Sequence, residues 1–142
     1  MNKIYQYLYI GSYYDLNNKD KLLELGITNI INLTQTVNPY PELFNYYKID
    51  INDSDENISK YFNKTNKFIC NSFIKGNKVL VCCFEGISRS STIILAFLIR
   101  KRRLSLENAL IFIKTKRRII SPNSYFLEQL VKYDKFDYDF VK

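Results

Sequence analysis

A short apolar run, a polar loop and an apolar helix follow one another in the middle of the chain, and this order restricts the fold more than any other feature. Residues 79–81 read Val-Leu-Val, which is typical of a buried strand in the centre of a sheet. After the loop, residues 91–103 are almost wholly apolar over their first two helical turns, which predicts a buried helix. A strand and a helix that are both buried need further layers to cover them, so the segment indicates an α/β domain.

Strand and helix patterns alternate along the rest of the chain. Expected strands cover residues 4–10, 27–33 and 46–51; expected helices cover a short segment between residues 17 and 26, then residues 59–75 and 106–117, and a last segment after residue 124. A chain of 142 residues fits one domain. We therefore predict a single domain over residues 1–142, with a mostly parallel sheet covered by helices on both faces.

The chain contains no His, which limits the chemistry available to it. Ser-His-Asp catalysis, Cys-His catalysis and His metal sites are excluded. The three cysteines, Cys70, Cys82 and Cys83, form neither a disulfide framework nor a zinc pattern, which is typical of a reducing compartment. The longest apolar run is residues 93–99, far short of a membrane span, and residues 1–14 lack the apolar core of a signal peptide. We expect a cytoplasmic protein without a membrane partner.

Cys83 and Arg89 bracket the loop between the predicted strand and helix. A loop at the carboxyl end of a strand that opens onto a helix directs several N–H groups at one anion. Five intervening residues let the loop curl around a phosphate that Arg89 can clamp, and Gly86 permits close backbone approach. Helix N-termini and guanidinium groups favour the thiolate form of cysteine, which attacks phosphoesters without a His base. Cys83 is thus a candidate nucleophile; the alternative is a buried structural cysteine.

The segment Cys83-Phe84-Glu85-Gly86-Ile87-Ser88-Arg89-Ser90 resembles the signature H-C-x5-R-[ST] of the Cys-dependent protein tyrosine phosphatase superfamily. It is most similar to the small dual-specificity phosphatases of the atypical, vaccinia-like group, and residues 8–11, 25–33 and 121–130 also resemble family segments. The resemblance implies a central five-stranded sheet and hydrolysis of phosphate monoesters through a phosphocysteine intermediate, with no metal and no cofactor. It implies phosphate binding by Phe84, Glu85, Gly86, Ile87, Ser88 and Arg89.

The resemblance also implies the remaining site residues. Asp53 matches the family's general acid, which protonates the leaving group and later activates water; Asp50 and Asp55 are other carboxyl groups in or beside the same loop, and Asp55 is the second choice. Ser90 resembles a hydroxyl that helps the thiolate leave phosphocysteine, or it is a helix cap. Asn123 resembles a residue that supports the active-site loop, or it too is a cap.

One position departs from the family pattern: Cys82 stands where the family has a His that orders the loop. The predicted function is a protein phosphatase acting on phosphotyrosine and on phosphoserine or phosphothreonine. The alternatives are an RNA 5′-phosphatase of the same superfamily and a phosphoprotein-binding pseudophosphatase whose turnover Cys82 has quenched. The absence of Lys from the loop argues against inositol lipids. Oxidised Cys83 could also be trapped as a disulfide by Cys82 or Cys70.

The net charge of +7 is concentrated in residues 100–118, which hold eight basic residues and one acid. Residues 100–103 lie roughly 15–20 Å along the predicted helix from Arg89, so they cannot contact the reacting phosphoryl group. They could instead attract an acidic protein surface or RNA; the alternative is a solvated helix face. The chain starts directly at its first predicted strand, without a dimer-forming extension, so a monomer is favoured.

Overall fold

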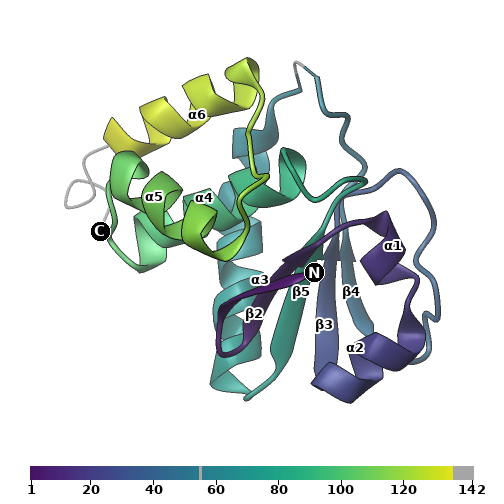
Figure 1. Ribbon diagram of the computed structural model, residues 1–142. Coiled ribbons are helices and arrows are strands. Elements are labelled where there is room, and N and C mark those ends of the chain that lie inside the picture. Colours follow the sequence, from purple (N-terminus) through teal and green to yellow (C-terminus); the bar gives the residue numbers. More distant parts are fainter. Residues whose placement is uncertain (55, 136–142) are drawn as a thin grey trace.

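The computed structural model describes residues 1–54 and 56–135, and its centre is one five-stranded sheet (Figure 1). The strands are β1 (Asn2–Tyr5), β2 (Leu8–Gly11), β3 (Ile27–Asn32), β4 (Asn45–Lys48) and β5 (Lys78–Cys82). Their order is β1-β2-β5-β3-β4, so the apolar run at residues 79–81 forms the central strand. β2, β5, β3 and β4 are parallel and β1 is antiparallel, which confirms the predicted mostly parallel sheet.

Helices cover both faces of this sheet (Figure 1). The helices are α1 (Tyr13–Leu16), α2 (Lys19–Leu25), the 3-10 helix η1 (Ile58–Tyr61), α3 (Phe62–Ile74), α4 (Arg89–Lys101), α5 (Leu106–Lys116) and α6 (Ser124–Lys135). Figure 1 shows α1 and α2 on one side of the sheet and α3, α4, α5 and α6 on the other. Two buried apolar clusters correspond to these two sides, and the larger one lies under α3 to α6.

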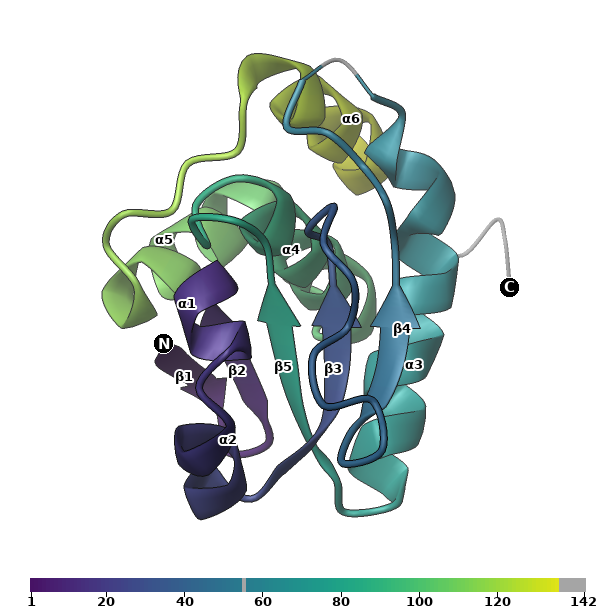
Figure 2. The ribbon, with the colours of Figure 1, turned by 90° about the vertical axis from the view of Figure 1, so that its right-hand side faces the viewer.

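Helix α4 lies at the centre of the larger cluster. It contacts α3, α5, α6 and β5, and every residue from Arg89 to Ile99 is buried. Burial of the apolar side chains in this stretch contributes about 1.5–3 kcal/mol for each large one. The loop before α4 therefore connects the two most deeply buried elements of the fold. In Figure 2 it lies at the carboxyl ends of the parallel strands.

Short sequence signals locate several element boundaries correctly. The Asn18 side chain accepts a hydrogen bond from the Lys21 N–H and caps α2, which ends at Gly26 with a φ of 80°. The Ser105 hydroxyl accepts from the Asn108 N–H and caps α5. These local bonds satisfy helix-end groups that would otherwise lack partners.

Four predicted boundaries were wrong. The predicted strand 4–10 is a hairpin, in which β1 folds back and pairs with the outer edge of β2, whose backbone groups would otherwise lack partners. β4 ends at Lys48 instead of residue 51, because its partner β3 ends at Asn32, whose carbonyl oxygen accepts the last hydrogen bond of this pairing from the Ile49 N–H. The predicted helix 59–75 starts with the 3-10 turn η1, and α4 starts at Arg89, two residues before the predicted position.

Candidate active site

The loop of residues 83–89, here called the phosphate loop, is held by hydrogen bonds to its carbonyl groups. Each of its four middle carbonyls accepts from a donor outside the loop: Tyr13 N to Phe84 O at 2.9 Å, Arg117 Nη2 to Glu85 O at 3.2 Å, Arg117 Nε to Gly86 O at 2.9 Å, and Ser121 N to Ile87 O at 2.9 Å. In a trans peptide the C=O and the next N–H point in opposite directions. The described residues contain no cis peptide, so the N–H groups of residues 85–88 point away from these donors.

These N–H groups are available to an anion. Within the described part of the chain, the N–H groups of residues 84–88 donate to no protein acceptor. The loop leads directly into α4, whose N-terminus adds the positive end of a helix dipole. Several unpaired N–H groups at such a helix end bind phosphate-like anions. The predicted phosphate-binding segment thus has the backbone geometry that this role requires.

Arg89 lies in the first turn of α4 and is buried, with 9% of its surface exposed. Its Nη1 donates to the carbonyl oxygens of Leu33 at 3.1 Å and Ile51 at 2.9 Å, so the segments that follow β3 and β4 orient the guanidinium. Its Nε is buried and has no partner among the described residues. No described carboxylate forms a salt bridge with Arg89. A buried guanidinium with an unpaired N–H is costly, and a bound oxyanion would offset that cost.

The thiol of Cys83 lies at the start of the loop, and its Sγ is 3.2 Å from the Ser90 Oγ. Both residues are buried. At that distance the Ser90 hydroxyl can donate a hydrogen bond to a thiolate, which stabilises the charge of a sulfur that acts as a leaving group. The structure therefore brings together the nucleophile and the hydroxyl that the sequence singled out.

Asn123 joins the phosphate loop to residues 52–54 and 56–57, here called the acid loop. Its Nδ2 donates to Asp53 Oδ1 at 2.8 Å, and its backbone N donates to the Ser88 Oγ at 3.0 Å. Its Oδ1 accepts from the Phe126 N–H at the start of α6, so it supports both loops and caps a helix as well. The Asp53 side chain is exposed, and Asn123 links it to Ser88 of the phosphate loop.

The other candidate acids do not share this position. The Asp50 carboxylate forms a salt bridge with the Lys48 ammonium at the end of β4. Asp55 lies outside the described residues. Asp53 is thus the described carboxyl group that contacts the residue braced against the phosphate loop.

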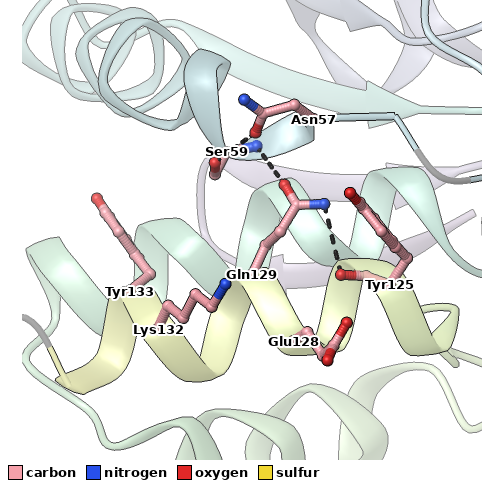
Figure 3. Close-up of a pocket in the computed structure, with 7 residues that line it drawn as sticks. All are labelled: Asn57, Ser59, Tyr125, Glu128, Gln129, Lys132 and Tyr133. Carbon is pink, nitrogen blue, oxygen red and sulfur yellow. Dashed lines mark hydrogen bonds between the residues drawn. The ribbon is translucent and has the colours of Figure 1, made fainter.

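Gln129 on α6 gives the acid loop a second attachment. Its Oε1 accepts from the Ser59 N–H at 2.8 Å, and its Nε2 donates to the Glu56 carbonyl oxygen at 3.0 Å. Figure 3 shows this side chain reaching from α6 towards the segment that carries Asn57 and Ser59. It forms part of the wall of a pocket of about 500 Å³ between η1 and α6. The acid loop is therefore attached to α6 through Glu56 as well.

Cys82 and Cys83 are neighbours in sequence but pack on opposite faces of the sheet. Cys82 belongs to the cluster under α1 and α2, and Cys83 to the larger cluster. Burial raises the pKa of the Cys82 thiol well above its usual range, and the thiol donates to the Ile31 carbonyl oxygen at 3.6 Å. Cys70 lies on α3, and all three cysteines are free. The structure does not bring either cysteine to Cys83 as a disulfide partner.

Sequence reasoning missed the role of Arg117, which it treated as one charge of the basic segment 100–118. The structure places its guanidinium on the phosphate loop, 31 residues earlier in the chain, and no local pattern signals that contact. Other members of the segment pack on aromatic rings: Arg100 over Tyr133 at 4.0 Å and Arg102 over Tyr5 at 4.4 Å. The basic segment is therefore only partly a solvated face.

Comparisons with known proteins agree with this geometry. Residues 8–136 match the family model "Dual specificity phosphatase, catalytic domain". Dual specificity protein phosphatase 1-B of Xenopus laevis is 42% identical over 134 residues, which are 93% of this chain and 36% of that protein. Protein phosphatase Slingshot of Drosophila melanogaster is 33% identical over 92% of this chain and 13% of its own length.

Two solved structures with more than 30% identity have the same fold. The human tyrosine phosphatase-like serine/threonine/tyrosine-interacting protein has a TM-score of 0.91 and 32% identity, covering 94% of this chain and 95% of that chain. DUSP15 has a TM-score of 0.91 and 31% identity, covering 98% and 90%. The chain spans about a third of the Xenopus relative it matches. The match over almost all described residues shows that this chain belongs to the dual-specificity phosphatases.

Proposed function

We propose that this chain hydrolyses phosphate monoesters on proteins, on phosphotyrosine and on phosphoserine or phosphothreonine, through a phosphocysteine intermediate. The observation that carries the proposal is the phosphate loop, which combines unpaired N–H groups, a buried guanidinium with an unpaired Nε and a thiol at its start. The N–H groups of residues 84–88 and Arg89 bind the three non-bridging oxygens, and they bind them more strongly as charge builds up in the transition state.

In the first step the Cys83 thiolate attacks phosphorus. The S–P bond forms while the bond from phosphorus to the leaving oxygen breaks, and the Asp53 carboxyl group gives its proton to that oxygen. The alcohol or phenol leaves, and the phosphoryl group remains on Cys83. The bond from Asn123 Nδ2 to Asp53 Oδ1 orients this carboxyl group towards the phosphate loop.

In the second step water attacks phosphorus. The Asp53 carboxylate takes a proton from the water, the new P–O bond forms and the S–P bond breaks, which returns the thiolate and releases inorganic phosphate. The Ser90 hydroxyl, 3.2 Å from the sulfur, donates a hydrogen bond to the departing thiolate. The reaction needs no His, which agrees with its absence from the chain.

A second candidate is hydrolysis of RNA 5′-phosphates, which exposed cations of the basic segment favour. Lys101, Lys114 and Arg118 are exposed. Exposed cations raise the association rate of a polyanion or an acidic protein surface, and salt suppresses that effect. A third candidate, phosphoprotein binding without turnover, is favoured by the similarity to a tyrosine phosphatase-like interacting protein, although Cys83 and Arg89 are both present.

One set of substrates separates the three candidates. The purified chain is given a phosphotyrosine peptide, a phosphothreonine peptide and 5′-triphosphate RNA, and phosphate release is followed. We expect release from both peptides, none from Cys83→Ser, and a phosphoryl group on Cys83 in acid-quenched samples by mass spectrometry. Faster release from RNA than from either peptide would favour the second candidate. Peptide binding without release by the wild-type chain would favour the third.

The basic segment is tested separately. A triple variant with Lys101, Lys114 and Arg118 changed to Gln leaves the aromatic-packed arginines and Arg117 in place. We expect it to keep full activity on para-nitrophenyl phosphate and to lose kcat/KM on an acidic phosphoprotein at low salt. If kcat/KM on the phosphoprotein depends on salt equally in the variant and the wild type, these three residues only form a solvated surface.

A further inference from the structure

Arg117 follows the last residue of helix α5, and its guanidinium donates hydrogen bonds to two distant parts of the chain. Its backbone N–H still bonds to the Ile113 carbonyl oxygen at 2.9 Å, so the helix end holds the residue. Its Nε donates to Gly86 O at 2.9 Å and its Nη2 to Glu85 O at 3.2 Å. Its Nη1 donates to the Asn2 Oδ1 at 2.6 Å, on strand β1. Each nitrogen of the guanidinium therefore has a partner, and two of these partners are consecutive carbonyls of the phosphate loop.

Holding these two carbonyls determines where two N–H groups point. The carbonyl of Glu85 shares a planar trans peptide with the N–H of Gly86, and the carbonyl of Gly86 shares one with the N–H of Ile87. With both oxygens bonded to Arg117, both N–H groups point to the opposite side, where an anion binds. The flanking carbonyls, of residues 84 and 87, are held by backbone N–H groups of other segments. Arg117 is thus the side chain that holds the two central carbonyls, of Glu85 and Gly86, whereas the Ser91 hydroxyl adds a bond of 2.7 Å to the Ile87 carbonyl.

The contact with Gly86 shows that the guanidinium fits tightly against the loop. Gly86 has a φ of 70°, and a Cβ on it would lie 2.8 Å from Arg117 Nη2 and 2.7 Å from Gly11 O. The bare Cα therefore allows the guanidinium to approach. A cation at the carbonyl ends also polarises the two peptide units, so their N–H ends become stronger donors.

We propose that Arg117 is a positioning residue for phosphoryl transfer: it aims the N–H groups of Gly86 and Ile87 at the phosphate and strengthens them. The inference rests on the proposed function, because it concerns the same loop. It assigns one basic residue to the site itself and takes it out of the group of surface charges.

The test compares two variants that differ in what they keep. Arg117→Met removes the charge and the donors but keeps an apolar stem; Arg117→Lys keeps the charge but cannot reach two carbonyls with a rigid fork. We expect Arg117→Met to weaken competitive inhibition by inorganic phosphate, and to lower kcat/KM on para-nitrophenyl phosphate, by about tenfold to a hundredfold, since small misplacements of binding groups have effects of this size. Arg117→Lys should lie between this variant and the wild type.

Two controls separate positioning from general damage. Lys67→Met removes an equal charge from the exposed surface of α3 and should leave the phosphate inhibition constant unchanged. Asn2→Ala removes the third partner of the same guanidinium and should have a smaller effect than Arg117→Met. All constants are measured at 10 °C, with thermal unfolding midpoints recorded for each protein. Unchanged phosphate inhibition and unchanged kcat/KM in Arg117→Met would overturn the proposal.

Binding without turnover keeps this inference distinct from the proposed function. Calorimetric titration of inorganic phosphate into Cys83→Ser and into the double variant Cys83→Ser/Arg117→Met needs no catalysis. Weaker binding by the double variant supports the positioning role, even if the wild-type chain hydrolyses no substrate. Equal binding by the two proteins would overturn the role of Arg117 and leave the proposed hydrolysis intact.

Discussion

The phosphate loop and the acid loop are joined through Asn123, but they are held in different ways. The phosphate loop connects the buried strand β5 to the buried helix α4, and its middle carbonyls are all held from outside. Residues 52–54 of the acid loop are exposed, and the side-chain amides of Asn123 and Gln129 attach the loop to α6. The anion site is therefore preorganised by the core, whereas the proton donor is positioned by the surface of one helix.

This difference separates two kinds of defect. Changes in the phosphate loop should impair binding and rate for every substrate, because the anion is common to all of them. Changes at the acid loop should impair only substrates whose leaving group needs a proton. The predictions below test that separation, from the largest expected effect to the smallest.

Arg89→Ala should have the largest effect. It removes the buried guanidinium and its unpaired Nε, so both phosphate binding and kcat/KM should fall, the latter by on the order of a thousandfold on any substrate. Steady-state kinetics on one aryl and one alkyl phosphate, with inhibition by inorganic phosphate, provide the measurement. A loss limited to the alkyl substrate would contradict the comparison.

Unlike Arg89→Ala, Asp53→Asn should affect some substrates much more than others. Loss of the general acid should slow a phosphothreonine peptide by about a hundredfold and para-nitrophenyl phosphate much less. Asn123→Ala removes the hydrogen bond to Asp53 and should show the same selectivity to a smaller degree, in addition to its effect at Ser88. The double variant should lose less transition-state stabilisation, expressed as a free energy, than the sum of the losses of the two single variants, because both changes act through one carboxyl group. Additive free-energy losses would show that Asn123 does not act through the Asp53 carboxyl group.

A pair of glycines tests how tightly the phosphate loop is packed. Gly86 and Gly76 have nearly equal φ values, 70° and 72°, so alanine at either costs about 1–2 kcal/mol of backbone strain. A Cβ at Gly76 meets nothing within 4 Å, whereas one at Gly86 clashes with Gly11 and Arg117. We expect Gly86→Ala to lose at least about tenfold in kcat/KM and Gly76→Ala to lose stability only. Equal kinetics in the two variants would show a loop that yields easily.

The smallest effect concerns the thiol behind the phosphate loop. Because burial raises the pKa of Cys82 in the folded state, the unfolded chain loses this proton first as the pH rises. The folded state should therefore lose up to about 1.4 kcal/mol of stability per pH unit above a pH near 8.5, and none below it. Urea unfolding between pH 7 and pH 10 should show a steeper decline for the wild type than for Cys82→Ala. Parallel curves would mean that Cys82 also ionises in the folded protein.

The parts of the fold that depend on neighbours in sequence could be predicted from the sequence. The order strand, loop and helix around Cys83 and Arg89, and the helices expected between residues 17 and 26 and at residues 106–117, follow from local patterns. The support that Asn123 gives to the active-site loop was implied only by the family resemblance, and its hydrogen bond to Asp53 was not predicted.

Contacts between distant segments were not predictable in this way. The hairpin of β1 and β2 looked like one strand, because both halves have strand-forming residues and only pairing distinguishes them. Arg117 looked like a surface charge, because its partners Glu85 and Gly86 are more than 30 residues away. A basic side chain reveals its role only when the carbonyls that it contacts are known.

The burial of α4 also limits how the protein can be inactivated. Arg89 and Ser90 belong to a helix that is buried from Arg89 to Ile99, so they cannot leave their positions by local fraying. Segments of this kind open only when the whole domain unfolds. The half-life of the anion site on heating should therefore equal the half-life of the native state, and a ligand that slows unfolding would extend both equally.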